Sequence, residues 1–182
     1  STNSFQNNCQ IKSIEFSQNS ELHTIENDAF NGSALESISL PSSIEELQEG
    51  WCRSTAKLRK VIISTNSKKF KYLDSDHKII ISNNNKKNEA KEEEFENIIF
   101  ASRDISEAKI PSFIKCIKSY SFHECEQLKK IDFSEDSKLE SIEKESFSYS
   151  SLENILIPSS VKHIGEKAFS WCQSLEKVEF SE

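Results

Sequence analysis

The sequence is poor in several residue types on which common functional sites depend. Its 182 residues include only three glycines, three prolines and two tryptophans, and no methionine. Glycines at Gly32, Gly50 and Gly165 are too scattered to form a loop that cradles a phosphate group. No apolar run approaches the ~20 residues that a membrane-spanning helix needs, and no signal-peptide pattern opens the chain.

Motifs for catalysis and metal binding are also missing. Neither HExxH nor GxSxG occurs, and the four histidines lie among polar neighbours at unrelated positions. The five cysteines include no CxxC pair, and their odd number argues against a disulfide framework. We therefore predict that the chain is not an enzyme and has no catalytic, cofactor-binding or metal-binding residues.

The charge distribution argues against two kinds of partner. There are 23 Lys and Arg against 30 Asp and Glu, a net charge of −7, and no more than two Lys or Arg residues are consecutive. Nucleic-acid-binding domains carry a basic stripe instead. We predict a protein partner, no nucleic acid, and no direct insertion of this chain into a membrane.

The sequence does contain a six-residue motif, Leu/Ile-x-x-Ile/Val-x-Phe/Leu/Ile, that recurs every 23 or 24 residues. It begins at Ile11, Leu35, Leu58, Leu128, Leu152 and Leu175, and a weaker copy begins at Ile105. A period of about 20–29 residues is typical of a leucine-rich-repeat solenoid. In such a fold each unit buries its apolar edge against its neighbours.

The unit from Leu152 to Leu175 shows the frame most clearly. Alternating apolar residues after Leu152 predict a short strand, which Pro158 ends because proline cannot donate to a strand ladder. The spacing of Val161, Ile164 and Phe169 then indicates a tight coil with one apolar side. We predict a parallel sheet on one face of the solenoid, with turns and short helical or 3₁₀ coils on the other.

Residues 64–104 break the repeat. Leu58 and Ile105 are two repeats apart, so the register continues across the gap, and the missing strand falls near Ile81. We interpret 64–104 as one decorated repeat within a single solenoid over residues 1–182. It contains a charged insert at 86–96, for which a solvated loop or short helix is the simpler interpretation and a docking loop the functional one.

One aromatic residue recurs in nearly every unit. The series is Phe5, Phe30, Trp51, Phe122, Phe147 and Phe169, with Trp51 in the place of Phe. Because the rings recur with the repeat, we expect a column of stacked rings inside the coil and not a ligand site. Cys125 and Cys172 each follow a ring by three residues, which predicts small buried thiols at matching positions.

The strand face is the candidate binding surface. The first, fourth and sixth residues of each six-residue motif point inward, so the third and fifth point to solvent. The candidates are Ser13, Glu15, Ser37, Ser39, Lys60, Ile62, Glu107, Lys109, Lys130, Asp132, Asn154, Leu156, Lys177 and Glu179. The alternative is that opposite charges on neighbouring strands only stabilise the ladder.

The repeat also resembles a known family. The run from Ile157 through Pro158 and Ala168-Phe169 to Leu175, and the run from Ile110 to Leu128, resemble the BspA-like leucine-rich repeat, I-P-x-x-V-x-x-I-G-x-x-A-F-x-x-C-x-x-L. The resemblance implies a cell-surface or extracellular location and adhesion to host cells, matrix proteins or other microbes, as in surface antigens of bacteria and parasitic protists. It transfers no ligand residues, because the family has no fixed ones.

An alternative remains open on the residues alone. The same solenoid could be a cytoplasmic scaffold or signalling module, which unpaired cysteines favour. The chain starts at Ser1 inside a repeat and stops just after one, so we expect a piece of a longer array whose targeting signals lie elsewhere. Abundant Asn, Lys, Ile and Phe indicates an A+T-rich genome.

Overall fold

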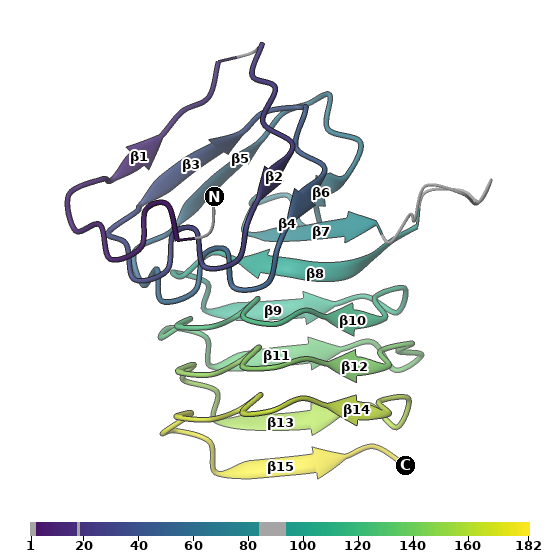
Figure 1. The fold of residues 1–182 in the computed structure, drawn as a ribbon. Helices are drawn as coiled ribbons and strands as arrows, with labels where there is room; N and C mark the ends of the chain where they lie inside the picture. The colour runs from purple at the N-terminus through teal and green to yellow at the C-terminus, as the bar shows by residue number, and fades with distance from the viewer. Residues whose placement is uncertain (1–2, 18, 84–93) are drawn as a thin grey trace.

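The chain forms a leucine-rich-repeat β-solenoid of about seven turns (Figure 1). The structure is a computed structural model that describes residues 3–17, 19–83 and 94–182. Most turns contribute one strand to a first row and a two-residue strand to a second row on the opposite side of the coil. The core lies between these rows.

The first row consists of the predicted strands. They are β1 (Ser13–Ile14), β3 (Ser37–Leu40), β5 (Lys60–Ile63), β9 (Glu107–Ile110), β11 (Lys130–Phe133), β13 (Asn154–Ile157) and β15 (Lys177–Phe180). Every pairing between them is parallel. In β3 and β5 alternate residues are buried, which confirms the predicted inward and outward faces.

The second row corrects one part of the prediction. Its members are β2 (Thr24–Ile25), β4 (Glu46–Leu47), β8 (Phe95–Ala101), β10 (Cys116–Ile117), β12 (Ser141–Ile142) and β14 (His163–Ile164). Across residues 3–17, 19–83 and 94–182 no α-helix or 3₁₀ helix occurs, so the predicted helical coils were wrong there. Several of these strands bury an apolar residue, such as Ile142, and paired two-residue strands satisfy its backbone without a helical turn.

Residues 64–104 replace one turn of the coil with an antiparallel meander. It comprises β6 (Phe70–Tyr72), β7 (Ile79–Asn83) and β8. A strand does occupy the position predicted near Ile81, but it pairs with β6 and β8 in the second row and not between β5 and β9 in the first. Both faces of this strand are covered, because Ile79 and Ile81 join one core cluster and Ile80 joins the other. That explains why the strand is a continuous apolar run and not an alternating one.

The meander divides the solenoid into two halves. In the described part of the chain, β5 pairs only with β3, and β9 pairs only with β11. Figure 1 shows β1, β3 and β5 inclined to the strands from β9 to β15. The predicted sheet is therefore interrupted after β5, and its strand pairing also breaks between β11 and β13.

The predicted aromatic column is present and contains one more ring than the sequence indicated. Phe122, Phe147 and Phe169 stack at centroid separations of 4.9 and 5.3 Å. In the other half Trp51 lies 6.4 Å from Phe30, and 6.0 Å from Phe100, which the sequence analysis did not assign to the column. The ring of Phe100 thus extends the part of the column that contains Phe30 and Trp51.

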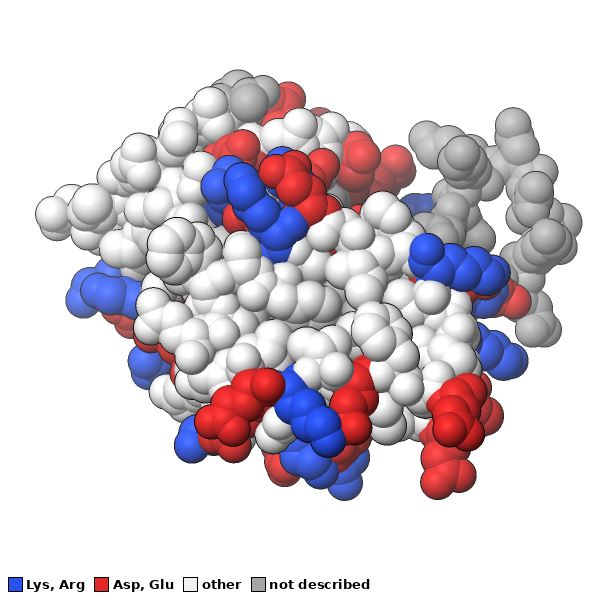
Figure 2. Space-filling view, turned by 90° about the horizontal axis from the view of Figure 1, so that it is seen from below, with Lys and Arg blue, Asp and Glu red and all other residues white. Residues whose placement is uncertain are grey.

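The C-terminal turn closes the described structure with an apolar end. Figure 2 views this end and shows charged side chains gathered at its rim, around an uncharged centre. Trp171, Val178 and Phe180 are all exposed in this turn. In the part of the chain that is described, no helix has the length and apolar character needed to cross a membrane.

Candidate protein-binding surface

The structure places both predicted rows on the outside of the first-row strands. Most of the fourteen side chains are exposed, and Ser37, Ser39 and Asp132 are half-buried. Because a strand rises by about 3.3 Å per residue, two outward side chains of one strand stand close to 7 Å apart. Each turn therefore presents a fixed pair of side chains to solvent.

Strand register aligns these side chains into columns. Ser13, Ser37 and Lys60 lie opposite one another across β1, β3 and β5. In the other half Glu107 lies opposite Lys130, and Lys109 lies opposite Asp132. In the last pair of strands Asn154 lies opposite Lys177, and Leu156 opposite Glu179.

Charged side chains of this face form ion pairs along single strands. Lys130 Nζ lies 2.7 Å from Asp132 Oδ2, and Lys177 Nζ lies 2.8 Å from Glu179 Oε1. The hydrogen bond that Lys130 donates to Asp132 raises the pKa of Lys130 above its usual range, and the negative charge of this carboxylate adds to the effect. Exposed pairs of this kind contribute little to stability, so they leave the face free to exchange partners.

Two aliphatic side chains interrupt the polar face. Ile62 is 40% exposed on β5, and Leu156 is 54% exposed on β13. Neither side chain is needed by the core, since the residues that follow them, Ile63 and Ile157, point inward. Exposed aliphatic groups with charged neighbours are the part of this face able to bury apolar area in a complex.

The face is not one continuous surface. The interruption after β5 separates the positions up to Ile62 from those that begin at Glu107. The sequence predicted a single row across all turns, because the spacing of the repeats continues through the gap. Spacing along the chain does not specify the angle between the two halves.

The predicted charged insert lies mostly outside the described residues. Positions 84–93 are not described, and of the insert 86–96 the structure describes residues 94–96. Phe95 and Glu96 belong to β8, and Lys115 Nζ lies 2.6 Å from Glu96 Oε2. The end of the insert is therefore strand and not loop.

The histidines lie in different turns of the solenoid, and the cysteines are unpaired. His123 is buried, whereas His23 and His163 are exposed in other turns. No disulfide joins the cysteines, and burial raises the pKa of the Cys52 and Cys125 thiols to about 11. Within the described ranges, no three His, Cys, Asp or Glu side chains are grouped so that they could hold a metal ion.

One known protein family matches the repeat. The family model of the BspA-type leucine-rich repeat region matches residues 1–91 and 93–182 in six copies. No curated protein matches the chain.

Two solved structures share the fold. A leucine-rich repeat protein from Eubacterium ventriosum is 21% identical, with a TM-score of 0.81 over 98% of this chain and 44% of that one. A leucine-rich cell surface protein from Faecalibacterium prausnitzii is 21% identical, with a TM-score of 0.51 over 88% of this chain and 52% of that one. The chain thus spans about half the length of each of these proteins or less.

Proposed function

Because this chain belongs to the BspA-type leucine-rich-repeat family, we propose that it is a protein-binding segment of a cell-surface adhesin. Its partners are host cells, matrix proteins or other microbes. The binding surface is the outward face of the first-row strands, and the chain carries out no catalysis. The description of the Faecalibacterium prausnitzii relative as a cell surface protein supports the location.

The observation that carries the proposal is the regular pair of outward side chains on each strand. A solenoid presents them on a hydrogen-bonded sheet, so little conformational entropy is lost when a partner binds. Leu156, 54% exposed beside Lys177 and Glu179, supplies an apolar centre with a charged rim. Such a centre and rim are the usual anatomy of a protein interface.

The proposed face can be tested on an array of purified extracellular-matrix proteins. Ile62→Asp and Leu156→Asp should each weaken binding by about tenfold, because each buries a charge in the interface. Phe113→Asp is the matched control, since Phe113 is 49% exposed but lies outside both rows. Equal binding by all three variants would show that another surface makes the contact.

The location is tested separately, by antibody labelling of intact and permeabilised source cells. Labelling without permeabilisation supports the adhesin. The cytoplasmic scaffold is the second candidate, and it is favoured by the five free cysteines, because secreted proteins usually pair theirs. Labelling that requires permeabilisation would replace the first proposal with the second.

A further inference from the structure

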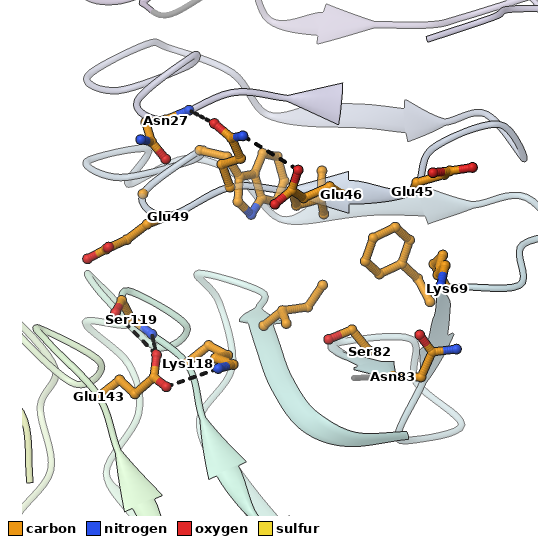
Figure 3. Close-up of a pocket in the computed structure, with 16 residues that line it drawn as sticks. Asn27, Glu45, Glu46, Glu49, Lys69, Ser82, Asn83, Lys118, Ser119 and Glu143 are labelled. Carbon is orange, nitrogen blue, oxygen red and sulfur yellow. Dashed lines mark hydrogen bonds and ion pairs between the residues drawn. The ribbon is translucent and has the colours of Figure 1, made fainter. Parts of the chain in front are cut away.

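The division between the two halves leaves a groove in the second row of strands. Among the described strands β4 pairs only with β2, and the row resumes with the sheet that contains β8. A cavity of about 570 Å³ lies between these sheets. Figure 3 shows that it is elongated along β4, from Glu45 and Lys69 at one end to Glu49 and Ser119 at the other.

The floor of the groove is apolar. Leu47, Trp51, Phe70 and Ile99 line it, and they come from three different strands and one turn. Ile99 reaches the groove because of a β-bulge: Ile80 and Ile81 of β7 pair with the residues on either side of Ile99. A bulge of this kind redirects one side chain, so Ile99 is half-buried between two fully buried neighbours.

One edge of β4 faces this groove. The backbone N–H groups of Glu46 and Gln48 donate to the carbonyl oxygens of His23, just before β2, and of Ile25 on β2. In a parallel ladder the intervening residue directs its N–H and C=O to the opposite side. Leu47 therefore offers both groups on the side away from β2, where an added strand could pair with them.

The other strand edge created by the division is closed by the protein itself. The Tyr72 hydroxyl accepts a hydrogen bond of 3.0 Å from Ile63 N–H and donates one of 2.9 Å to the Val61 carbonyl. These are the backbone groups on the side of β5 that faces away from β3. The fold thus blocks the edge of β5, whereas the edge of β4 lies along a groove.

The rim of the groove is acidic. Its carboxylates are Glu45, Glu46, Glu49 and Glu143, against the ammonium groups of Lys69 and Lys118. Lys118 Nζ lies 3.0 Å from Glu143 Oε1, so this pair balances itself. The remaining excess of negative charge favours an occupant that carries Lys or Arg.

We propose that this groove binds an extended, basic segment of another protein, which adds as a strand along β4. Backbone hydrogen bonds to Leu47 would provide affinity, and alternate side chains would provide specificity. Apolar side chains of the segment would rest on the floor, and the alternate Lys or Arg side chains would reach the acidic rim. The site lies on the opposite side of the coil from the sheet face and does not depend on it.

The test uses a dye-labelled synthetic peptide in which Val and Lys alternate over seven residues. Fluorescence anisotropy should show saturable binding, and Trp51 emission should change in a Trp171→Phe background, where Trp51 is the sole tryptophan. Glu45→Gln, Glu46→Gln and Glu49→Gln together should weaken binding at least about tenfold. Methylating alternate peptide nitrogens should weaken it similarly, because the strand hydrogen bonds are lost.

The matched control is Glu15→Gln, Glu107→Gln and Glu179→Gln, which removes the same charge from the sheet face. It should leave peptide binding within about twofold. Ser82→Arg, which adds a positive charge to the groove wall, is a second groove variant should the triple variant unfold. Circular dichroism checks that each variant is folded.

Three results would overturn the proposal. One is the absence of saturable binding up to about 1 mM peptide. Another is equal weakening by the groove and sheet-face variants, which would indicate non-specific attraction to net charge. The third is self-association in sedimentation experiments that the groove variants abolish, since a second copy would then fill the groove.

Discussion

At the scale of single residues, His123 couples stability to pH. Its side chain is 2% exposed, and its pKa falls from 6.5 to about 3, first because of burial and then because of the nearby charges of Arg103 and Arg53. Between these two pKa values the unfolded chain binds a proton that the folded chain does not. Stability is therefore retained above pH 6.5 and lost as the pH falls toward 3.

The expected loss can be measured by urea unfolding at pH 7 and pH 5. His123 alone should reduce the free energy of unfolding by about 2 kcal/mol over this interval. His123→Asn keeps a hydrogen-bonding group near Ser148 but does not titrate, so this part of the loss should disappear. The control variant His163→Asn, at an exposed position, should lose the same stability between pH 7 and pH 5 as the wild type. An unchanged pH dependence in His123→Asn would contradict the assignment, because Glu124, whose pKa is raised by burial, shifts stability in the opposite direction.

Tyr72 stabilises the edge of β5 through its hydroxyl group. Tyr72→Phe would leave the N–H of Ile63 and the carbonyl of Val61 without their partner. We expect a loss of about 1–2 kcal/mol in chemical denaturation, since unsatisfied backbone groups at a strand edge are costly. Tyr149→Phe, at an exposed ring, should change stability by less than about 0.5 kcal/mol. A similar result for both variants would mean that water replaces the Tyr72 hydroxyl at no cost.

At the scale of elements, the aromatic column stabilises contact between successive turns. Phe147 is fully buried, with Phe122 on one side and Phe169 on the other. Phe147→Ala should cost ~3–5 kcal/mol, because it removes ring contacts with two turns and leaves a cavity. Guanidinium unfolding measures this, and Phe113→Ala at an exposed position is the control. A loss below about 1 kcal/mol would contradict a structural role for the column.

The strands and the column could be predicted from the sequence, because both depend on the inward side chains that repeat. The turn conformation could not. Each complete turn around a ring contains two left-handed residues four apart, such as Tyr120 with Glu124 and Lys167 with Trp171. Glycine normally marks this conformation, but here backbone hydrogen bonds between turns hold other residues in it, as from Phe122 N–H to the Ser146 carbonyl.

The groove was missed for a related reason. Glu45, Glu46 and Glu49 lie between the apolar positions of their repeat, where solvated residues are expected. No local pattern in the sequence separates them from other exposed glutamates. Their surroundings depend on β7, which the sequence analysis placed in the wrong row, and on β8, which it assigned to no row. The outward rows were predictable because they follow from alternation within one strand.

At the scale of the whole molecule, Arg103 connects the two halves. Its side chain is 3% exposed, and it donates to the carbonyl oxygens of Ala101 and Ser121 in one half and of Cys52 in the other. Its own N–H donates to the Leu58 carbonyl, and its guanidinium lies 5.1 Å from the centre of the Phe100 ring. In a solenoid, cooperative unfolding requires strong contact between neighbouring units. This junction has no first-row pairing in the described chain, so Arg103 joins the halves together with other side-chain contacts, such as Trp51 with Phe100 and Ser102 with the Arg59 carbonyl.

Arg103→Met should therefore weaken the coupling between the halves more than it weakens either half. We expect a total loss of about 1–3 kcal/mol, because each of three buried carbonyl groups loses one hydrogen bond. The Ser121 carbonyl keeps the N–H of Ala101, and the Cys52 carbonyl keeps the Thr55 hydroxyl. Hydrogen exchange followed by mass spectrometry should show faster exchange in residues 24–63, while residues 116–164 stay protected as in the wild type. Arg59→Met, at an exposed position near the same junction, should leave both regions unchanged. If Arg103→Met raised exchange equally in both regions, the solenoid would unfold as one unit, and its two halves would not be separable.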